Sequence, residues 1–133
     1  MESLLPLLLL ISITSVIGLT LRAKKGVIKN GSRLKISEGE FDGKYGSRLT
    51  ILQFSTTFCS ECRTAKAIVK DVVKDSKDIT YVEVDAESNL DLVRRVDIRS
   101  TPTTIFLDSK GFEIARAKGA PKRDQLIKAI KAI

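Results

Sequence analysis

The stretch that most restricts the fold of this chain is FSTTFCSECRTAK, residues 54–66, because it holds both cysteines, Cys59 and Cys62, at the end of an apolar run. That run, Leu49–Ser55, is β-prone and typical of a buried strand. From Cys59 to Lys74 apolar residues recur every three or four positions, which predicts one buried face of a helix. A structural disulfide, half of a metal site and a redox centre can each be built from two cysteines at such a junction.

Strand and helix patterns alternate along the rest of the chain. The predicted elements are strands at 79–85, 103–108 and 112–117, with a turn at 109–111 between the last two, and helices at 87–96 and 122–133. In the helix at 87–96, Leu90, Val93 and Val96 are expected to share the buried side. This order predicts an α/β fold with a mixed sheet flanked by helices. The cysteines follow the carboxyl end of a strand, where open α/β sheets place their active sites.

The composition excludes several kinds of site. The chain contains no histidine, which removes imidazole as a metal ligand, as a general base and as a partner that activates a catalytic cysteine. A zinc site within one chain would need carboxylates beside the two thiolates, a poor match to the usual ligands, so no metal site is predicted. The formal net charge is +7, but no basic face interleaved with aromatic residues and no nucleic-acid-binding motif accompanies it. No nucleic-acid partner is therefore expected.

Residues 45–133 resemble the thioredoxin superfamily through motifs in a fixed order. A strand leads into Cys-x-x-Cys at a helix start, a second strand ends in Asp85, the segment VDIRSTPTTIFLD contains Pro102, and a hairpin and a helix follow. With its apolar amino-terminal run the chain looks like a membrane-anchored member of bacterial, actinobacterial-like type. The resemblance implies a thioredoxin-like fold, no cofactor, a cis Pro102 packed against the cysteines, and a Thr101 backbone that pairs with an extended protein substrate.

The two cysteines are expected to divide the chemistry of thiol–disulfide exchange. Cys59 lies in the first turn of the predicted helix, where unpaired backbone N–H groups and the helix dipole favour a thiolate, so it is the expected nucleophile. Cys62 faces the core one turn later and is placed to resolve a mixed disulfide. A permanent structural disulfide is the alternative, but so short a loop constrains little chain entropy.

The dipeptide between the cysteines departs from the usual thioredoxin pattern. It is Ser60-Glu61, whereas thioredoxins usually have Gly-Pro. Glu61 is expected to repel a thiolate at Cys59 and Arg63 to attract it, so these modulating residues act in opposite directions.

Other departures surround the cysteines. Phe58 replaces the tryptophan that usually precedes the first cysteine, Gln53 stands where thioredoxins commonly carry a buried acid, and Tyr81 stands where they carry a lysine. Proton assistance to Cys62 by a buried carboxylate is therefore not expected. Phe58 is a candidate for substrate contact, although packing is the simplest role for Phe54, Phe58 and Tyr81.

An uncharged run, Ser3–Leu21, is long enough as a helix to cross a hydrocarbon core of about 30 Å. Neither a basic segment before it nor a small-residue cleavage pattern after it suggests a signal peptide, so 1–21 is predicted to be an uncleaved transmembrane anchor. Residues 22–47, rich in glycine and charge, are expected to be a basic juxtamembrane linker with one short strand near Arg33–Ile36. The thioredoxin-like domain is then expected at 48–133.

The basic residues that follow the apolar run set its expected orientation. They are Arg22, Lys24, Lys25, Lys29, Arg33 and Lys35. By the positive-inside rule the domain is expected on the cytoplasmic side of the cell membrane, behind a single span. The same residues can rest on anionic headgroups.

The leading functional interpretation is a membrane-tethered thiol–disulfide oxidoreductase, a protein-disulfide reductase, because a cytoplasmic domain meets a reducing pool. Its expected partners are a protein thiol or disulfide and the membrane, with the electron donor left open. The alternatives are an extracytoplasmic oxidoreductase of reverse topology, a redox-inactive binding module that uses Thr101-Pro102, and a zinc site shared by two copies of the Cys59–Cys62 pair.

Overall fold

The computed structural model describes residues 4–133. Its elements, in chain order, are α1 (Leu4–Lys24), β1 (Ile28–Asn30), the 3-10 helix η1 (Glu38–Glu40), β2 (Leu49–Ser55), α2 (Ser60–Val73), β3 (Ile79–Asp85), α3 (Leu90–Arg95), β4 (Thr103–Asp108), β5 (Glu113–Lys118) and α4 (Arg123–Ala132). The α/β order and the long predicted elements are confirmed.

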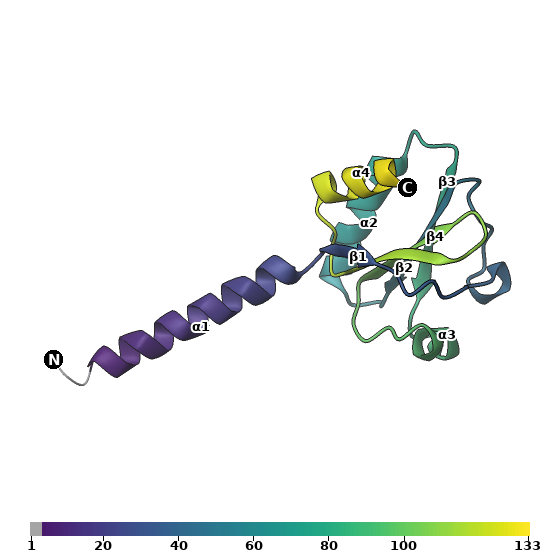
Figure 1. Cartoon of the computed structure of the whole chain (residues 1–133). Helices are drawn as coiled ribbons and strands as arrows, with labels where there is room; N and C mark the ends of the chain where they lie inside the picture. The colour runs from purple at the N-terminus through teal and green to yellow at the C-terminus, as the bar shows by residue number, and fades with distance from the viewer. Residues whose placement is uncertain (1–3) are drawn as a thin grey trace.

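The strands form one mixed sheet in the order β1-β5-β4-β2-β3 (Figure 1). β2 lies inside the sheet, parallel to β3 and antiparallel to β4, while β5 pairs antiparallel with both β4 and β1. The parallel pair β2–β3 needs a crossover, which α2 supplies. The carboxyl end of β2, from which the cysteine-containing loop leaves, therefore lies within the sheet, next to the start of β4.

Each face of the sheet is covered by its own apolar cluster, as the alternation of side chains along β2 requires. On the face covered by α2 and α4, the buried residues include Leu49, Ile51, Val69, Phe106, Leu126 and Ile130. On the other face, which α3 and the η1 segment cover, they include Ile36, Phe41, Leu52, Phe54, Leu92 and Ile105. Gln53 shares the first face with Ile51 and is fully buried under α2.

The segment before β2 differs from its predicted form. Its strand is β1 at Ile28–Asn30, not the predicted strand at Arg33–Ile36, where only Lys35 makes an isolated bridge, to Phe112. β1 forms because its backbone adds an edge to β5, a contact that local propensity does not encode. Ile36 and Phe41, within the segment expected to be a linker, are buried in the core.

The buried side of α3 also differs from its predicted form. Leu92 and Val96 are buried, whereas Leu90, expected on that side, is 51% exposed. The helix has six residues and begins at Leu90. Because it is shorter than two turns, the spacing of its apolar residues did not identify the buried side correctly.

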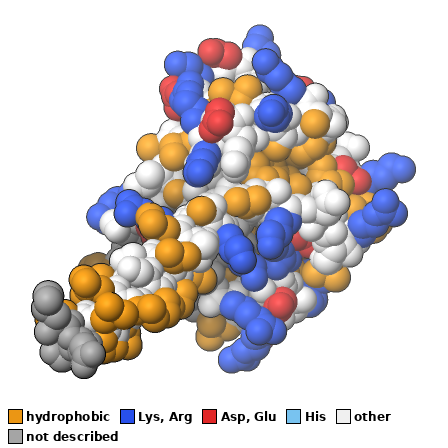
Figure 2. Space-filling view, turned by 60° about the vertical axis from the view of Figure 1, so that its left-hand side comes forward, with side chains coloured by type: hydrophobic (Ala, Val, Ile, Leu, Met, Phe, Trp, Pro, Cys, Tyr) orange, Lys and Arg blue, Asp and Glu red, His pale blue; other side chains and the backbone are white. Residues whose placement is uncertain are grey.

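The apolar helix α1 projects away from the sheet domain (Figure 1), and every one of its residues is exposed. It is long and apolar enough to cross a membrane, with 21 residues and basic side chains, Arg22 and Lys24, in its last turn. Figure 2 shows its apolar surface and the Lys and Arg side chains on the domain face visible beside it. Ser3, the first residue of the predicted span, lies outside the described residues.

Candidate active site

The two cysteines are joined by a disulfide at the point where β2 gives way to α2. Cys59 is the N-cap of α2, and the backbone N–H of Cys62 donates to the Cys59 sulfur at 3.1 Å. Cys59 is partly exposed, and Cys62 is buried, with 4% of its surface exposed. The exposed sulfur therefore lies at the amino end of the helix, where its dipole and an aimed N–H group stabilise negative charge.

A neutral polar pair lies beneath this turn of α2. The Gln53 side-chain amide donates to the Cys62 carbonyl at 2.9 Å, and the Tyr81 hydroxyl donates to Gln53 Oε1 at 2.9 Å. Burial, and to a smaller degree the nearby charge of Glu83, raises the pKa of the Tyr81 phenol. Gln53 and Tyr81 thus hold the helix start through hydrogen bonds without bringing a charge to Cys62.

The Thr101–Pro102 loop lies beside the cysteine-containing loop. The Thr101–Pro102 peptide is cis, as the resemblance implied, and Pro102 is buried. The Thr101 hydroxyl lies 3.4 Å from the hydroxyl of Thr56, which follows β2, and the backbone N–H of Gly119 donates to the Pro102 carbonyl at 2.7 Å. The loop is therefore attached both to the active-site loop and to the end of β5.

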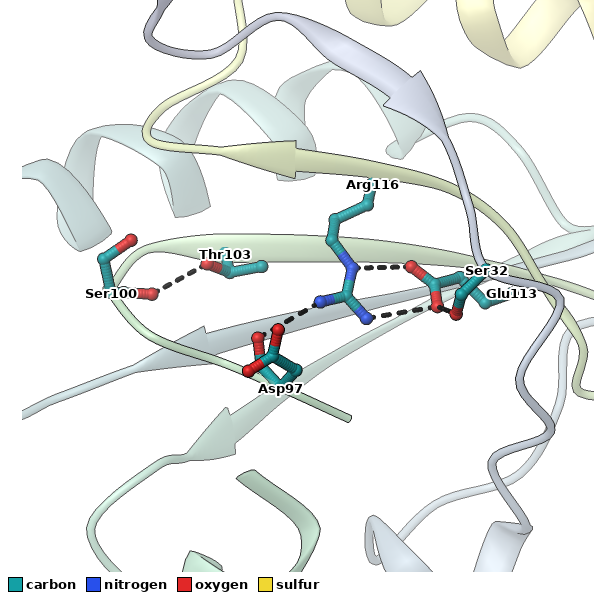
Figure 3. A network of polar contacts seen from close by, with 6 residues as sticks. All are labelled: Ser32, Asp97, Ser100, Thr103, Glu113 and Arg116. Atoms are coloured by element: carbon teal, nitrogen blue, oxygen red, sulfur yellow. Dashed lines mark hydrogen bonds and ion pairs between the residues drawn. The ribbon is translucent and has the colours of Figure 1, made fainter. Parts of the chain in front are cut away.

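A buried ion pair contacts the segment that leads into the Thr101–Pro102 loop (Figure 3). Glu113, fully buried, accepts from the Arg116 guanidinium at 2.6 Å and from the Ser32 hydroxyl at 2.5 Å. Arg116 also donates to the backbone carbonyl of Asp97, at 3.4 Å. Burial raises the pKa of the Glu113 carboxyl, but the Arg116 and Ser32 hydrogen bonds outweigh it and hold the pKa below its usual range.

The expected modulating residues occupy different surroundings. Glu61 forms an ion pair with Lys25, which follows α1, with 3.3 Å between Nζ and Oε1. Arg63 lines a shallow depression together with both cysteines. Ser60 opens α2 and is exposed.

Phe58, the candidate substrate contact, does not pack. Its side chain is 97% exposed, whereas Phe54 is fully buried, so the packing role suggested for Phe58 is wrong. Phe58 ends the loop immediately before the N-cap, where the chain has left the sheet and no second layer covers it.

Three contacts of this site had no signal in the sequence. They are the Lys25–Glu61 ion pair, the Thr56–Thr101 contact and the Gly119–Pro102 hydrogen bond, which join residues 36, 45 and 17 positions apart. Polar residues at such separations carry no periodicity, so only the topology brings them together.

Comparison with known proteins agrees with the fold and the cysteine pair. The family model Thioredoxin matches residues 32–132. Thioredoxin H5 of Oryza sativa subsp. japonica is 32% identical over 77 residues, 58% of this chain and 56% of that protein. Thioredoxin of Ophiophagus hannah is 28% identical over 86 residues, 65% of this chain and 80% of that protein. This chain thus spans little more than half of the rice protein.

Solved structures show the same likeness. A structure described as thioredoxin-2, a component of malaria parasite protein secretion machinery, superposes with a TM-score of 0.59 at 28% identity and covers 65% of this chain and 84% of that chain. The fold and the Cys59–Cys62 pair together support thiol–disulfide oxidoreductase activity. On the match over 32–132, the chain belongs to the thioredoxin family.

Proposed function

We propose that this protein is a membrane-tethered protein-disulfide reductase. The observation that carries the proposal is the position of the two sulfurs: Cys59 is partly exposed at the N-cap of α2, and Cys62 is buried one turn later within bonding distance. A thiolate is favoured at the first position, and the second thiol is protected until an intermediate forms.

The exchange proceeds in two steps and balances in electrons. The Cys59 thiolate attacks one sulfur of a substrate disulfide, a new S–S bond forms, and the other substrate sulfur leaves as a thiolate and takes up a proton. The Cys62 thiol then loses its proton and attacks Cys59, which releases the second substrate sulfur as a thiol. Two electrons pass to the substrate, and the enzyme ends with the Cys59–Cys62 disulfide that the structure contains. A dithiol donor must reduce it for the next turnover.

Substrate recognition is assigned to the surface around Cys59. The Thr101-Pro102 loop, attached to the active-site loop through Thr56, is proposed to pair with an extended substrate backbone. Phe58 is proposed to contact the substrate because it presents an aromatic ring to solvent one residue before the nucleophile.

The membrane part of the proposal rests on α1 and its flanking charges. α1 is proposed as a single-pass anchor, with 1–21 as the anchor and 22–47 as the juxtamembrane segment; β1, Ile36 and Phe41 of this segment pack into the thioredoxin-like domain that was expected at 48–133. The basic residues after the span favour a cytoplasmic domain. A cytoplasmic location supplies reducing equivalents, which supports the reductive direction.

Trapping tests the proposal. In vesicles, the full-length protein should reduce insulin with dithiothreitol as the donor, and both Cys59→Ser and Cys62→Ser should lose this activity. Cys62→Ser should accumulate a mixed disulfide, because the thiol that releases the intermediate is missing. Cys59→Ser is the matched control and should trap little, because its remaining sulfur is buried.

Adducts are compared on non-reducing gels after acid quenching. Equal trapping by the two variants, or full activity in either, would contradict the mechanism. An inactive wild-type protein that still binds a partner through the Thr101-Pro102 loop would support the binding-module alternative instead.

A further inference from the structure

A cleft of about 430 Å³ lies between the carboxyl-terminal end of α1, which borders the sheet domain, and the loop that contains Thr101. The residues that matter in its lining are Leu21, Lys24, Lys25, Glu61, Thr101 and Lys118. Three parts of the chain meet here: the end of the proposed anchor, the dipeptide between the cysteines, and the loop proposed to bind substrate. Neither cysteine lines this cleft, but Glu61 lies between them in sequence, so the cleft adjoins the active site on the side of α1.

The junction between α1 and the domain is short and hydrogen-bonded. Gly26 is buried, and its N–H donates to the Lys118 carbonyl at 2.6 Å. β1 then pairs with β5 from Ile28 onward. The Lys25–Glu61 ion pair adds a direct contact between the end of the anchor and α2. With α1 as the proposed anchor, these contacts would keep the cysteine pair close to the end of the span.

The height of the cysteine pair above the proposed span would be small. Leu21 is the last residue of the apolar run, and Lys25 follows it by four residues, a rise of about 6 Å along a helix. The polar headgroup layer is about 5–8 Å thick on each side of the hydrocarbon core. Because Lys25 pairs with Glu61, which lies between the two cysteines in sequence, an α1 that spans the bilayer as proposed would hold the cysteine pair near the headgroup layer.

The charges of the cleft indicate which segment fits it. Lys24 and Lys118 line it, and the negative charge of Glu61 is offset by Lys25. A segment bound in the cleft would therefore lie beside two lysines, Lys24 and Lys118. Opposite charges on such a segment would favour its binding and its orientation.

We infer that the substrate is an acidic, extended juxtamembrane segment of another membrane-anchored protein, whose disulfide lies close to the bilayer surface. This inference rests on the proposed reductase function and uses the same two-electron exchange. Confinement of both proteins to one bilayer raises the effective concentration of the substrate. The fixed junction limits the benefit to disulfides near the surface.

Reporter peptides of different height test the inference. Full-length protein, pre-reduced and freed of reductant, is placed in phosphatidylcholine vesicles with a single-span peptide that carries a fluorogenic disulfide outside the bilayer. The disulfide stands about 5 or about 30 residues beyond the span, at most about 17 or about 100 Å away. The near, acidic reporter should be reduced about tenfold faster than the far one. Equal single-turnover rates on the two reporters would overturn the inference.

Charge variants test the second element of the inference. Lys118→Glu should lower the advantage of an acidic over a neutral near reporter about two- to fivefold, because one exposed cation of the cleft becomes an anion. Lys110→Glu, the same change in the turn between β4 and β5 at the other end of the sheet, should leave that advantage unaltered. A Lys118→Glu protein that keeps the full preference would contradict the assignment.

Two further measurements separate the possible failures. Insulin reduction by the wild-type protein in the same vesicles reports on the proposed function alone: if insulin is reduced and the reporters are not distinguished, only the inference fails. If Lys118→Glu instead abolishes binding of the domain face to phosphatidylglycerol vesicles and no reporter is preferred, the cleft takes lipid headgroups and the inference is overturned.

Discussion

Gln53 holds the start of α2 through hydrogen bonds and carries no charge. It is fully buried, donates to the Cys62 carbonyl at 2.9 Å and accepts from Tyr81 at 2.9 Å. An amide suits this position because it offers a donor to one neighbour and an acceptor to the other. A carboxylate could accept from Tyr81 but would face the Cys62 carbonyl oxygen, which also only accepts. Neither Gln53 nor Tyr81, whose phenol pKa is raised by burial, is therefore suited to take the proton that leaves Cys62 during exchange.

Replacing Gln53 by Glu should make stability depend on pH. In the folded protein the introduced carboxyl must stay protonated to donate to Cys62, and burial raises its pKa above the unfolded value of about 4.3. A raised acid pKa means that stability is lost as pH rises above the unfolded value, by about 1.4 kcal/mol per unit until the folded pKa is passed. Urea unfolding of the oxidised protein at several pH values measures this. A profile parallel to that of the wild type would show that the carboxyl ionises freely.

The Glu113–Arg116 pair predicts the opposite dependence in the native protein. Because the pKa of Glu113 is lowered in the folded state, its stabilising effect is present above the unfolded pKa and is lost as pH falls below about 4. Glu113→Gln should cost about 3 kcal/mol at pH 7, since it leaves Arg116 largely buried without a counter-charge. The difference in unfolding free energy between the wild type and Glu113→Gln should be smaller at pH 3. Asp75→Asn, an exposed carboxylate, is the control; a deficit that does not change with pH would contradict this account.

Individual residues differ in how far the sequence could predict them. Cys59 and Cys62 were placed correctly in the fold because they lie at a junction that the strand and helix patterns define, whereas the cis Pro102 followed only from the resemblance to thioredoxins. The exposure of Phe58 was not predicted, since apolar character suggests burial and a loop without periodicity gives no contrary signal. The pairing of Lys25 with Glu61 depends on how α1 joins the sheet.

At the scale of elements, β2 and α2 were predictable and the junction before them was not. A β-prone, largely apolar run predicted β2, all seven residues of which are buried, and the three- to four-residue spacing of apolar positions predicted α2. β1 has three residues, of which none is fully buried, so it has no pattern of its own and exists through its pairing with β5. This weakly encoded strand connects α1 to the rest of the sheet.

Gly26 tests the importance of that junction. It has a φ of +74°, and a Cβ atom there would lie 2.1 Å from the Ala120 carbonyl oxygen. Gly26→Ala should therefore destabilise the domain by about 1–3 kcal/mol and disturb the hydrogen bond to Lys118. Gly39→Ala, where a Cβ meets nothing within 4 Å, is the matched control and should change stability by less than about 0.5 kcal/mol. Urea unfolding measures the loss of stability, and the rate of protease cleavage near Lys25 measures the disturbance of the junction. Equal results for the two variants would show that the junction accepts a side chain at residue 26.

At the scale of the whole molecule, the fold and the anchor act on different properties. The sheet with α2 supplies the exchange chemistry, and α1 with its junction is the part proposed to set where that chemistry takes place. Hydropathy predicts the span, because nineteen uncharged residues carry their own signal. The contact of Lys25 with Glu61 beside the cysteines follows only from the three-dimensional junction of α1 with the sheet. A free thioredoxin domain would meet disulfides throughout its compartment, whereas the proposed anchor would restrict this one to disulfides near a membrane.

The side of the membrane then decides the direction of electron flow. A fluorescent reporter that matures only in the cytoplasm, fused after Ile133, should be active, and an alkaline phosphatase that needs export should be inactive, because the cations after the span retain the domain inside. Arg22→Glu with Lys24→Glu should shift part of the population outward. Lys110→Glu with Lys128→Glu changes the net charge by the same amount but far from the span. This control should leave the orientation unaltered. An active phosphatase on the wild-type chain would place the Cys59–Cys62 pair in an oxidising compartment, where the disulfide form would accumulate and the reductive role could not be sustained.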